Sequence, residues 1–157
     1  MAIKIRQAAI DDVAAISKIF HQVSIIHYQN VEREFVLPKI EDEQKYIAET
    51  IDNKDAVLFV AEENKNILGY LILYIQKYPD CFFMDTRKGF IGSVGVDENY
   101  RGKGIGTKLL KAAETYLKKN DIFVFETDVF VFNKGAEKLY NRFGFKDIKK
   151  YKKKILK

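Results

Sequence analysis

Residues 101–106, Arg-Gly-Lys-Gly-Ile-Gly, combine the residue types that hold a phosphate group. Three glycines in five positions allow backbone angles that other residues avoid, and they let a ligand approach the main chain closely. A helical pattern begins near residue 104, so free N–H groups and the positive end of the helix dipole would face that ligand. Arg101 and Lys103 add full positive charges. The segment therefore predicts a cradle for a phosphate or pyrophosphate.

The spacing of the glycines excludes two common nucleotide-binding motifs. A Walker A loop needs Lys followed by Ser or Thr directly after its last glycine, but Thr107 follows Gly106 here. A dinucleotide fingerprint needs glycines in the pattern G-x-G-x-x-G. Counted from Gly102 or Gly104, its third glycine would fall on Thr107 or Leu109, so this motif fails too.

Strands and helices that would position this segment can be read from the apolar pattern. Residues 90–96 predict a strand, and apolar residues spaced three and four apart over 104–119 predict an amphipathic helix. Two apolar runs, 56–61 and 67–75, predict a β-hairpin whose strands are buried on both faces. The other predicted elements are strands at 2–7, at 122–131 and from Phe145 onward, and helices at about 13–26, 41–51 and 134–143.

The order of these elements is β α α β β β α β α β. It predicts an α/β fold in which a mixed, mostly antiparallel sheet is covered by helices on both faces. A length of 157 residues is typical of one domain, and no repeat or linker interrupts the chain. We therefore expect a single domain over 1–157 that ends in a lysine-rich terminal strand or tail, 146–157.

The net charge of +5 comes from this tail, because residues 146–157 hold seven lysines and one aspartate. The body, residues 1–145, carries a net charge of −1. A nucleic-acid-binding domain would spread a basic face over the fold, so we expect no nucleic-acid partner. The lysines would instead keep a terminal edge strand soluble. The alternative is that the tail alone binds nucleic acid, with a strong dependence on salt.

Other functional classes are also disfavoured. No apolar run reaches the ~20 residues of a membrane span, and the N-terminus shows no secretory signal, so we expect a cytoplasmic protein without a membrane partner. Cys81 is the only cysteine, and we expect a buried thiol. His21 and His27 are six residues apart and do not share a helix face. No metal site is predicted.

Two motifs resemble those of the GNAT family of N-acetyltransferases. The pattern Arg101-x-x-Gly104-x-Gly106 resembles the acyl-CoA-binding motif of that family. The pattern from Asn133 through Ala136 and Tyr140 to Gly144-Phe145 resembles its C-terminal signature. The element order and chain length are also those of a single such domain.

The resemblance implies acetyl-CoA as co-substrate. Main-chain groups of residues 94–96 would contact the pantetheine and the acetyl carbonyl, with Gly92 and Gly95 easing a bulge there. Main-chain N–H groups of 102–107 would hold the pyrophosphate, and Asn133 would contact the cofactor arm or cap its helix. The implied donor-binding residues are Val94, Gly95, Val96, Arg101, Gly102, Lys103, Gly104, Ile105, Gly106, Thr107, Asn133 and Tyr140.

The implied catalytic acid is Tyr140, which would protonate the departing thiolate. The amine must first lose a proton, and Asp128 on the strand before Asn133 is the first candidate for the base, with Glu126 second. A carboxylate buried on that strand would have a raised pKa. The alternatives are that Asp128 pairs with a lysine or caps a turn, and that a chain of water replaces a single base.

Acceptor-binding residues are predicted near the end of the first helix, at Tyr28 and Glu32. An acidic stretch there would attract a cationic acceptor such as a polyamine, an aminoglycoside or a basic peptide, or would be a solvated surface. Its members are Glu32, Glu34, Glu41, Asp42 and Glu43.

We therefore expect an N-acetyltransferase that moves an acetyl group from acetyl-CoA to the primary amine of a small molecule or peptide by direct attack in a ternary complex. The alternative is a non-catalytic acyl-CoA-binding module, a sensor or partner subunit of the same fold. The acceptor and the exact acyl group stay open. Dimers are common in the family, and the terminal strand offers an edge for pairing.

Overall fold

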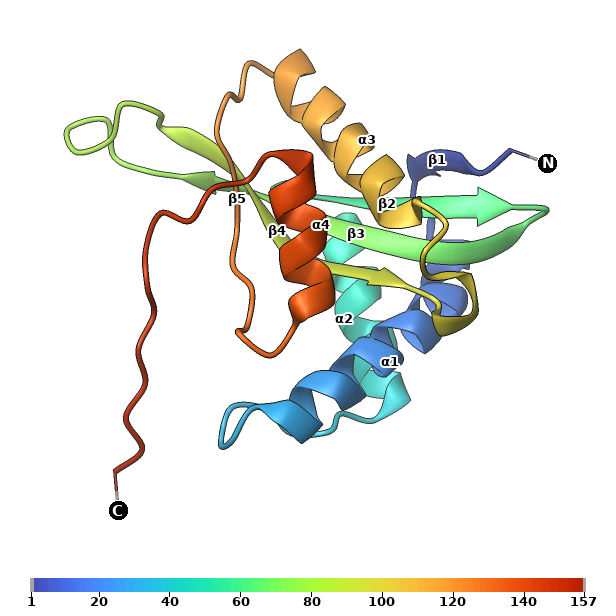
Figure 1. The fold of residues 1–157 in the computed structure, drawn as a ribbon. Helices are drawn as coiled ribbons and strands as arrows, with labels where there is room; N and C mark the ends of the chain where they lie inside the picture. The colour runs from blue at the N-terminus through green and yellow to red at the C-terminus, as the bar shows by residue number, and fades with distance from the viewer. Residues whose placement is uncertain (1, 157) are drawn as a thin grey trace.

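A computed structural model describes residues 2–156 as a five-stranded sheet flanked by four α-helices (Figure 1). The strands follow the chain in the order β1-β2-β3-β4-β5, and all neighbours are antiparallel except β4 and β5. This confirms the predicted fold class. The strands are β1 Lys4–Gln7, β2 Ala56–Glu63, β3 Asn66–Lys77, β4 Arg87–Val96 and β5 Phe125–Thr127. The α-helices are α1 Val13–Asn30, α2 Ile40–Asp52, α3 Ile105–Lys119 and α4 Lys134–Phe143.

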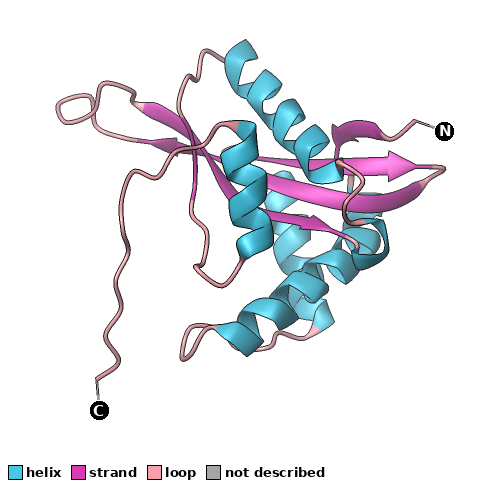
Figure 2. Cartoon of the chain, in the orientation of Figure 1, coloured by secondary structure: helices cyan, strands magenta, loops and turns pink. Residues whose placement is uncertain are grey.

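The helices cover the sheet in two pairs because β2 and β3 are apolar on both faces (Figure 2). Leu58 and Val60 point to the core beneath α1 and α2, while Phe59 and Ala61 point to the core beneath α3. Each fully buried aliphatic side chain contributes about 1.5–3 kcal/mol through removal from water. The hairpin predicted from the two apolar runs is thus the centre of both cores.

Strands β4 and β5 pair over only three residue pairs and then separate. The pairs join 89–91 to 125–127 in parallel, so residues 92–96 have no strand partner on that side in the described chain. A bulge lies here as well, because Ile72 pairs with Ser93 while Leu73 pairs with Ile91, leaving Gly92 as the extra residue. The sequence predicts a bulge eased by Gly92 and Gly95; it forms at Gly92, whereas Gly95 pairs regularly with Tyr70. The separation leaves the end of β4 open to a ligand.

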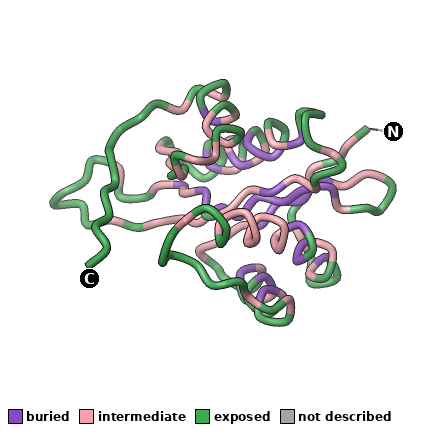
Figure 3. Tube along the Cα trace, turned by 60° about the horizontal axis from the view of Figure 1, so that its bottom comes forward, coloured by how far each residue is buried: buried purple, intermediate pink, exposed green. Residues whose placement is uncertain are grey.

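Several boundaries differ from the prediction. The strand expected over 122–131 is limited to Phe125–Thr127, because the chain then turns away into the loop before α4. The terminal strand expected from Phe145 does not form: residues 145–156 are extended but unpaired, and they run away from the sheet (Figure 1). They are exposed almost throughout (Figure 3). Mutual repulsion among closely spaced lysines opposes packing of this segment.

Two smaller findings concern single residues. Cys81 is exposed in the loop between β3 and β4, so the expectation of a buried thiol is wrong. That loop projects beyond the sheet, where no second layer covers it (Figure 1). Within residues 2–156, no helix has the length and apolar character to cross a membrane.

Candidate active site

A cleft of about 950 Å³ lies where β4 and β5 separate. Its walls come from α1, the free end of β4, the start of α3, the loop after β5 and α4. All but one of the predicted donor-binding residues line it: Val94, Gly95, Val96, Arg101, Gly102, Gly104, Ile105, Gly106, Thr107, Asn133 and Tyr140. The sheet separation thus brings two motifs more than 25 residues apart in sequence to one cavity.

The phosphate end of the cleft, residues 101–107, is shaped by backbone conformation. Gly102 and Gly104 have φ angles of +78° and +76°, and an added Cβ at either position would meet no atom within 4 Å. Glycine is therefore favoured at both positions by the positive φ angle, because a larger side chain would not collide with any neighbour. Gly104 is the N-cap of α3, and the first main-chain bond of the helix runs from the N–H of Lys108 to its carbonyl, 3.1 Å. The N–H groups of 105–107 are left free for an anion.

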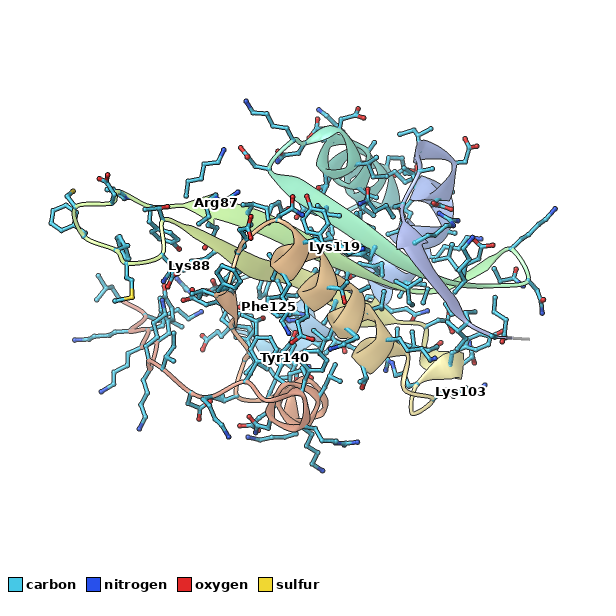
Figure 4. All side chains as sticks on the ribbon, turned by 90° about the horizontal axis from the view of Figure 1, so that it is seen from above. Arg87, Lys88, Lys103, Lys119, Phe125 and Tyr140 are labelled. Carbon is cyan, nitrogen blue, oxygen red and sulfur yellow. The ribbon has the colours of Figure 1, made fainter. Side chains whose placement is uncertain are left out.

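The two basic residues of this segment differ in placement. Arg101 lines the cleft, and its Nε donates to the carbonyl of Val96 at 3.1 Å, which leaves the terminal nitrogens for a ligand. Lys103 does not line the cleft; its Nζ lies 4.8 Å from the centre of the Tyr100 ring. Figure 4 shows Lys103 beyond the start of α3, away from Tyr140. Arg101 is thus the better placed of the two for a direct phosphate contact.

Asn133 begins α4 as predicted. Its Oδ1 accepts from the N–H of Ala136 at 3.1 Å, so the side chain caps the helix and also lines the cleft. The helix ends at Phe143 and is capped by Gly144, whose φ of +108° lies in the left-handed region that favours glycine.

Tyr140 is 6% exposed and packs between α4 and the sheet, near Phe125 (Figure 4). Its ring lies 5.4 Å from that of Phe145. Burial raises the pKa of Tyr140, the nearby Thr127 hydroxyl lowers it in part, and the Asp128 carboxylate raises it further. The phenol therefore keeps its proton over a wider pH range than a free tyrosine and is able to donate it.

The two candidate bases are not equivalent. Asp128 lines the cleft but is exposed, on the loop after β5, so the expectation of a buried carboxylate is wrong. Glu126 does not line the cleft and forms an ion pair with Lys88 at 3.0 Å. Pairing with a lysine, which was the alternative role for Asp128, is therefore observed for Glu126. Asp128 stays next to Tyr140 and within reach of a ligand.

The predicted acceptor residues lie outside the cleft. Tyr28 is half exposed, and Glu32 accepts a hydrogen bond from Lys153 through its main-chain carbonyl at 2.9 Å. Neither residue lines the cavity. The part of the cleft between α1 and the loop after β5 is lined instead by His27, Phe35 and Phe130, which come from α1, the loop after it and the loop after β5.

A buried polar network also escaped sequence analysis. The carboxylate of Glu43 on α2 is 2% exposed and accepts from Ser24 Oγ at 2.6 Å, and His21 Nδ1 lies 2.8 Å from it. Farther along α2, the hydroxyls of Tyr46 and Tyr74 lie 2.6 Å apart, and partial burial of Tyr46, which is 39% exposed, raises its pKa. Glu43 belongs to the acidic stretch expected either to attract a cationic acceptor or to be a solvated surface, but packing of α1 against α2 buries it. The network joins the two helices beneath the cleft.

The sequence is similar to that of known N-acetyltransferases. An uncharacterized N-acetyltransferase of Bacillus subtilis is 26% identical over 144 residues, which cover 91% of this chain and 89% of that protein. An N-alpha-acetyltransferase of Sulfurisphaera tokodaii is 32% identical over 111 residues, 66% of this chain and 65% of that protein. A crystal structure of a mutant Bacillus halodurans protein shares the fold, with a TM-score of 0.90, 23% identity and coverage of 98% of this chain and 99% of that one.

The family assignment rests on a match that includes both motifs of the cleft. Residues 24–145, from the middle of α1 to the end of the Asn133–Phe145 motif, match the family described as the Acetyltransferase (GNAT) family. The matched region holds the phosphate end, the free edge of β4 and Tyr140. The chain therefore belongs to the GNAT family of acetyltransferases.

Proposed function

We propose that this acetyltransferase moves an acetyl group from acetyl-CoA to a primary amine by direct attack while both substrates occupy the cleft. One observation carries the proposal: an anion-binding helix start, a free strand edge and a buried tyrosine meet in one cavity. Holding both reactants together removes much of the entropic barrier to reaction. The curated N-alpha-acetyltransferase relative supports an amine as the acceptor.

The residues of the cleft fit acetyl-CoA by their chemistry. The free N–H groups of 105–107 and the Arg101 guanidinium suit a pyrophosphate, and any Cβ at Gly104 would strain the turn that presents them. The main chain of 94–96 pairs with β3 but has no strand partner on the side of β5, and that free side suits an amide-bearing arm and a polarised carbonyl. Acetyl-CoA supplies the activated acetyl thioester.

The proton steps fall to Asp128 and Tyr140. Asp128 would take the proton of the ammonium, directly or through water, so that the amine nitrogen can form its bond to the acetyl carbon. The bond from that carbon to sulfur breaks, and the Tyr140 hydroxyl gives its proton to the thiolate. The attacking nitrogen gives its second proton, directly or through water, to the Tyr140 oxygen, which restores the phenol and leaves the amide. Asp128 releases the first proton to solvent.

The test is calorimetric titration with acetyl-CoA, with dephospho-CoA and ATP as controls, followed by a thiol-release assay on a broad amine panel. The proposal expects micromolar binding of acetyl-CoA, about −8 kcal/mol, and amine-dependent thiol release. Absence of binding would remove the donor assignment. Binding without any turnover would identify a non-catalytic acyl-CoA module.

A further inference from the structure

The acceptor end of the cleft, between α1 and the loop after β5, is lined mainly by apolar and aromatic side chains. His27 is at its centre, with ring centres of Phe35 and Phe130 each 5.4 Å away and of Phe132 5.6 Å away. These contacts are edge to face, at interplanar angles of 71–78°. Phe130 and Phe132 are nearly parallel, at 21°, but their ring centres are 5.9 Å apart and the two rings stack on each other. The rings of this cluster therefore pack on one another and leave no gap between two faces for a cation.

The cleft offers little negative charge. Asp128 is the only acidic residue among the described residues that line it. The carboxylate of Glu43 is held by Ser24 and His21 behind the wall, and that of Glu34 is paired with Lys153 at 2.6 Å. Arg101 and Arg142 line the other walls. One ammonium group can be matched here, but a second one would meet apolar rings or positive charge.

We infer that the acceptor is a primary amine with a single positive charge and one apolar or aromatic arm. The inference rests on the proposed function and deepens it. The arm lies against His27, Phe35 and Phe130, and the nitrogen lies on the side of Asp128. Polycationic acceptors such as polyamines and aminoglycosides are excluded by the charge of the cleft. The same chemistry occurs in arylalkylamines and in peptides whose first residue is large and apolar.

The first experiment compares five acceptors by thiol release at saturating acetyl-CoA: phenethylamine, peptides beginning with Phe or Ser but otherwise identical, spermidine and kanamycin. We expect kcat/KM for the Phe peptide to exceed that for the Ser peptide at least about 10-fold. Spermidine and kanamycin should be slower than phenethylamine by a similar factor. The ratio of phenethylamine to the Phe peptide distinguishes a small acceptor from a polypeptide.

The second experiment alters the aromatic wall. Phe35→Ala, in an exposed loop, should raise KM for the apolar acceptor about 10-fold while the Kd for acetyl-CoA stays unchanged. The matched control is Phe82→Ala, a phenylalanine that is 82% exposed in the loop between β3 and β4. It should leave both constants unchanged.

The outcomes separate this inference from the proposed function. If acetyl-CoA binds and spermidine or kanamycin is the best acceptor, or if the Ser and Phe peptides react equally, the apolar-arm inference is wrong and the transferase stands. Loss of acetyl-CoA binding in the unaltered protein would instead overturn the donor assignment. Donor binding with no reaction of any of the five amines would overturn both.

Discussion

The two ends of the cleft are built in different ways. The phosphate end is a continuous segment, 101–107, whose shape comes from glycine backbone angles and the start of one helix. The acceptor end is assembled from side chains on three distant segments, α1, the loop around Phe35 and the loop around Phe130. The local sequence therefore specifies the phosphate end, whereas only tertiary packing specifies the acceptor end.

This contrast has a chemical consequence. A phosphate is recognised by main-chain N–H groups, which every residue carries, so glycine spacing alone reveals the site. An acceptor arm is recognised by side chains, and their identity can change without disturbing the backbone. The two ends should therefore respond separately to substitution, and Tyr140, which lines the same cleft, should affect turnover alone.

The largest expected effect is that of Tyr140→Phe. Loss of the hydroxyl removes the proton donor for the thiolate, so kcat should fall at least about 100-fold, while Kd for acetyl-CoA stays within a factor of two of the unaltered protein. Steady-state kinetics and calorimetry measure the two quantities. Tyr116→Phe, on α3 outside the cleft, is the control. Full activity of Tyr140→Phe would exclude the acid role.

Gly104→Ala should come next and act at the phosphate end only. Alanine at a φ of +76° costs about 1–2 kcal/mol, which should weaken acetyl-CoA binding about 5- to 30-fold. Gly144→Ala imposes similar strain at φ +108° but outside the cleft, so it should lower the melting temperature without changing Kd. Equal loss of binding in both variants would contradict a local role for Gly104.

A smaller difference should separate the two basic residues. Arg101→Gln should weaken acetyl-CoA binding about 10-fold, because a charged hydrogen bond to phosphate is lost. Lys103→Gln should weaken it less than about 3-fold, since an exposed charge outside the cleft is screened by solvent. Calorimetry at two salt concentrations measures both. Reversal of this order would place Lys103 on the phosphate in the bound state.

The smallest expected effect is one of pH. Burial raises the pKa of Tyr140 above its ordinary value of 10.0, so the protonated, donating form persists at least to that pH. The rate kcat should therefore show no alkaline fall caused by Tyr140 below about pH 10. A fall below that pH that disappears in Tyr140→Phe would mean that the tyrosine titrates in the ordinary range.

The sequence predicted correctly those elements whose structure depends on residues within one short segment. The β2–β3 hairpin, the α3 start with its three glycines and the Asn133 cap of α4 all follow from local patterns. It failed at Thr127, where β5 ends because the chain turns away from β4 into the loop before α4, although the next residues still favour a strand. It also failed at Glu43, whose burial depends on how α1 and α2 cross.

The acceptor end could not be predicted for the same reason. Phe35 and Phe130 are almost 100 residues apart, and neither lies in a recognisable motif. The charge pattern predicted Glu32 as an acceptor-binding residue. A carboxylate on a loop can bind an acceptor in the cleft only if it lines the cleft, and Glu32 does not. Orientation of that kind is a property of packing and is absent from residue spacing.

The three-pair ladder between β4 and β5 has a dynamic consequence. The amides of β5 are secured by few main-chain bonds, so they should exchange with solvent through local opening far sooner than those of the β2–β3 hairpin. A donor held between the start of α3 and α4 would close that opening. At 100 times its Kd it would stabilise the chain by about 2.7 kcal/mol, so hydrogen exchange would report donor binding first at β5.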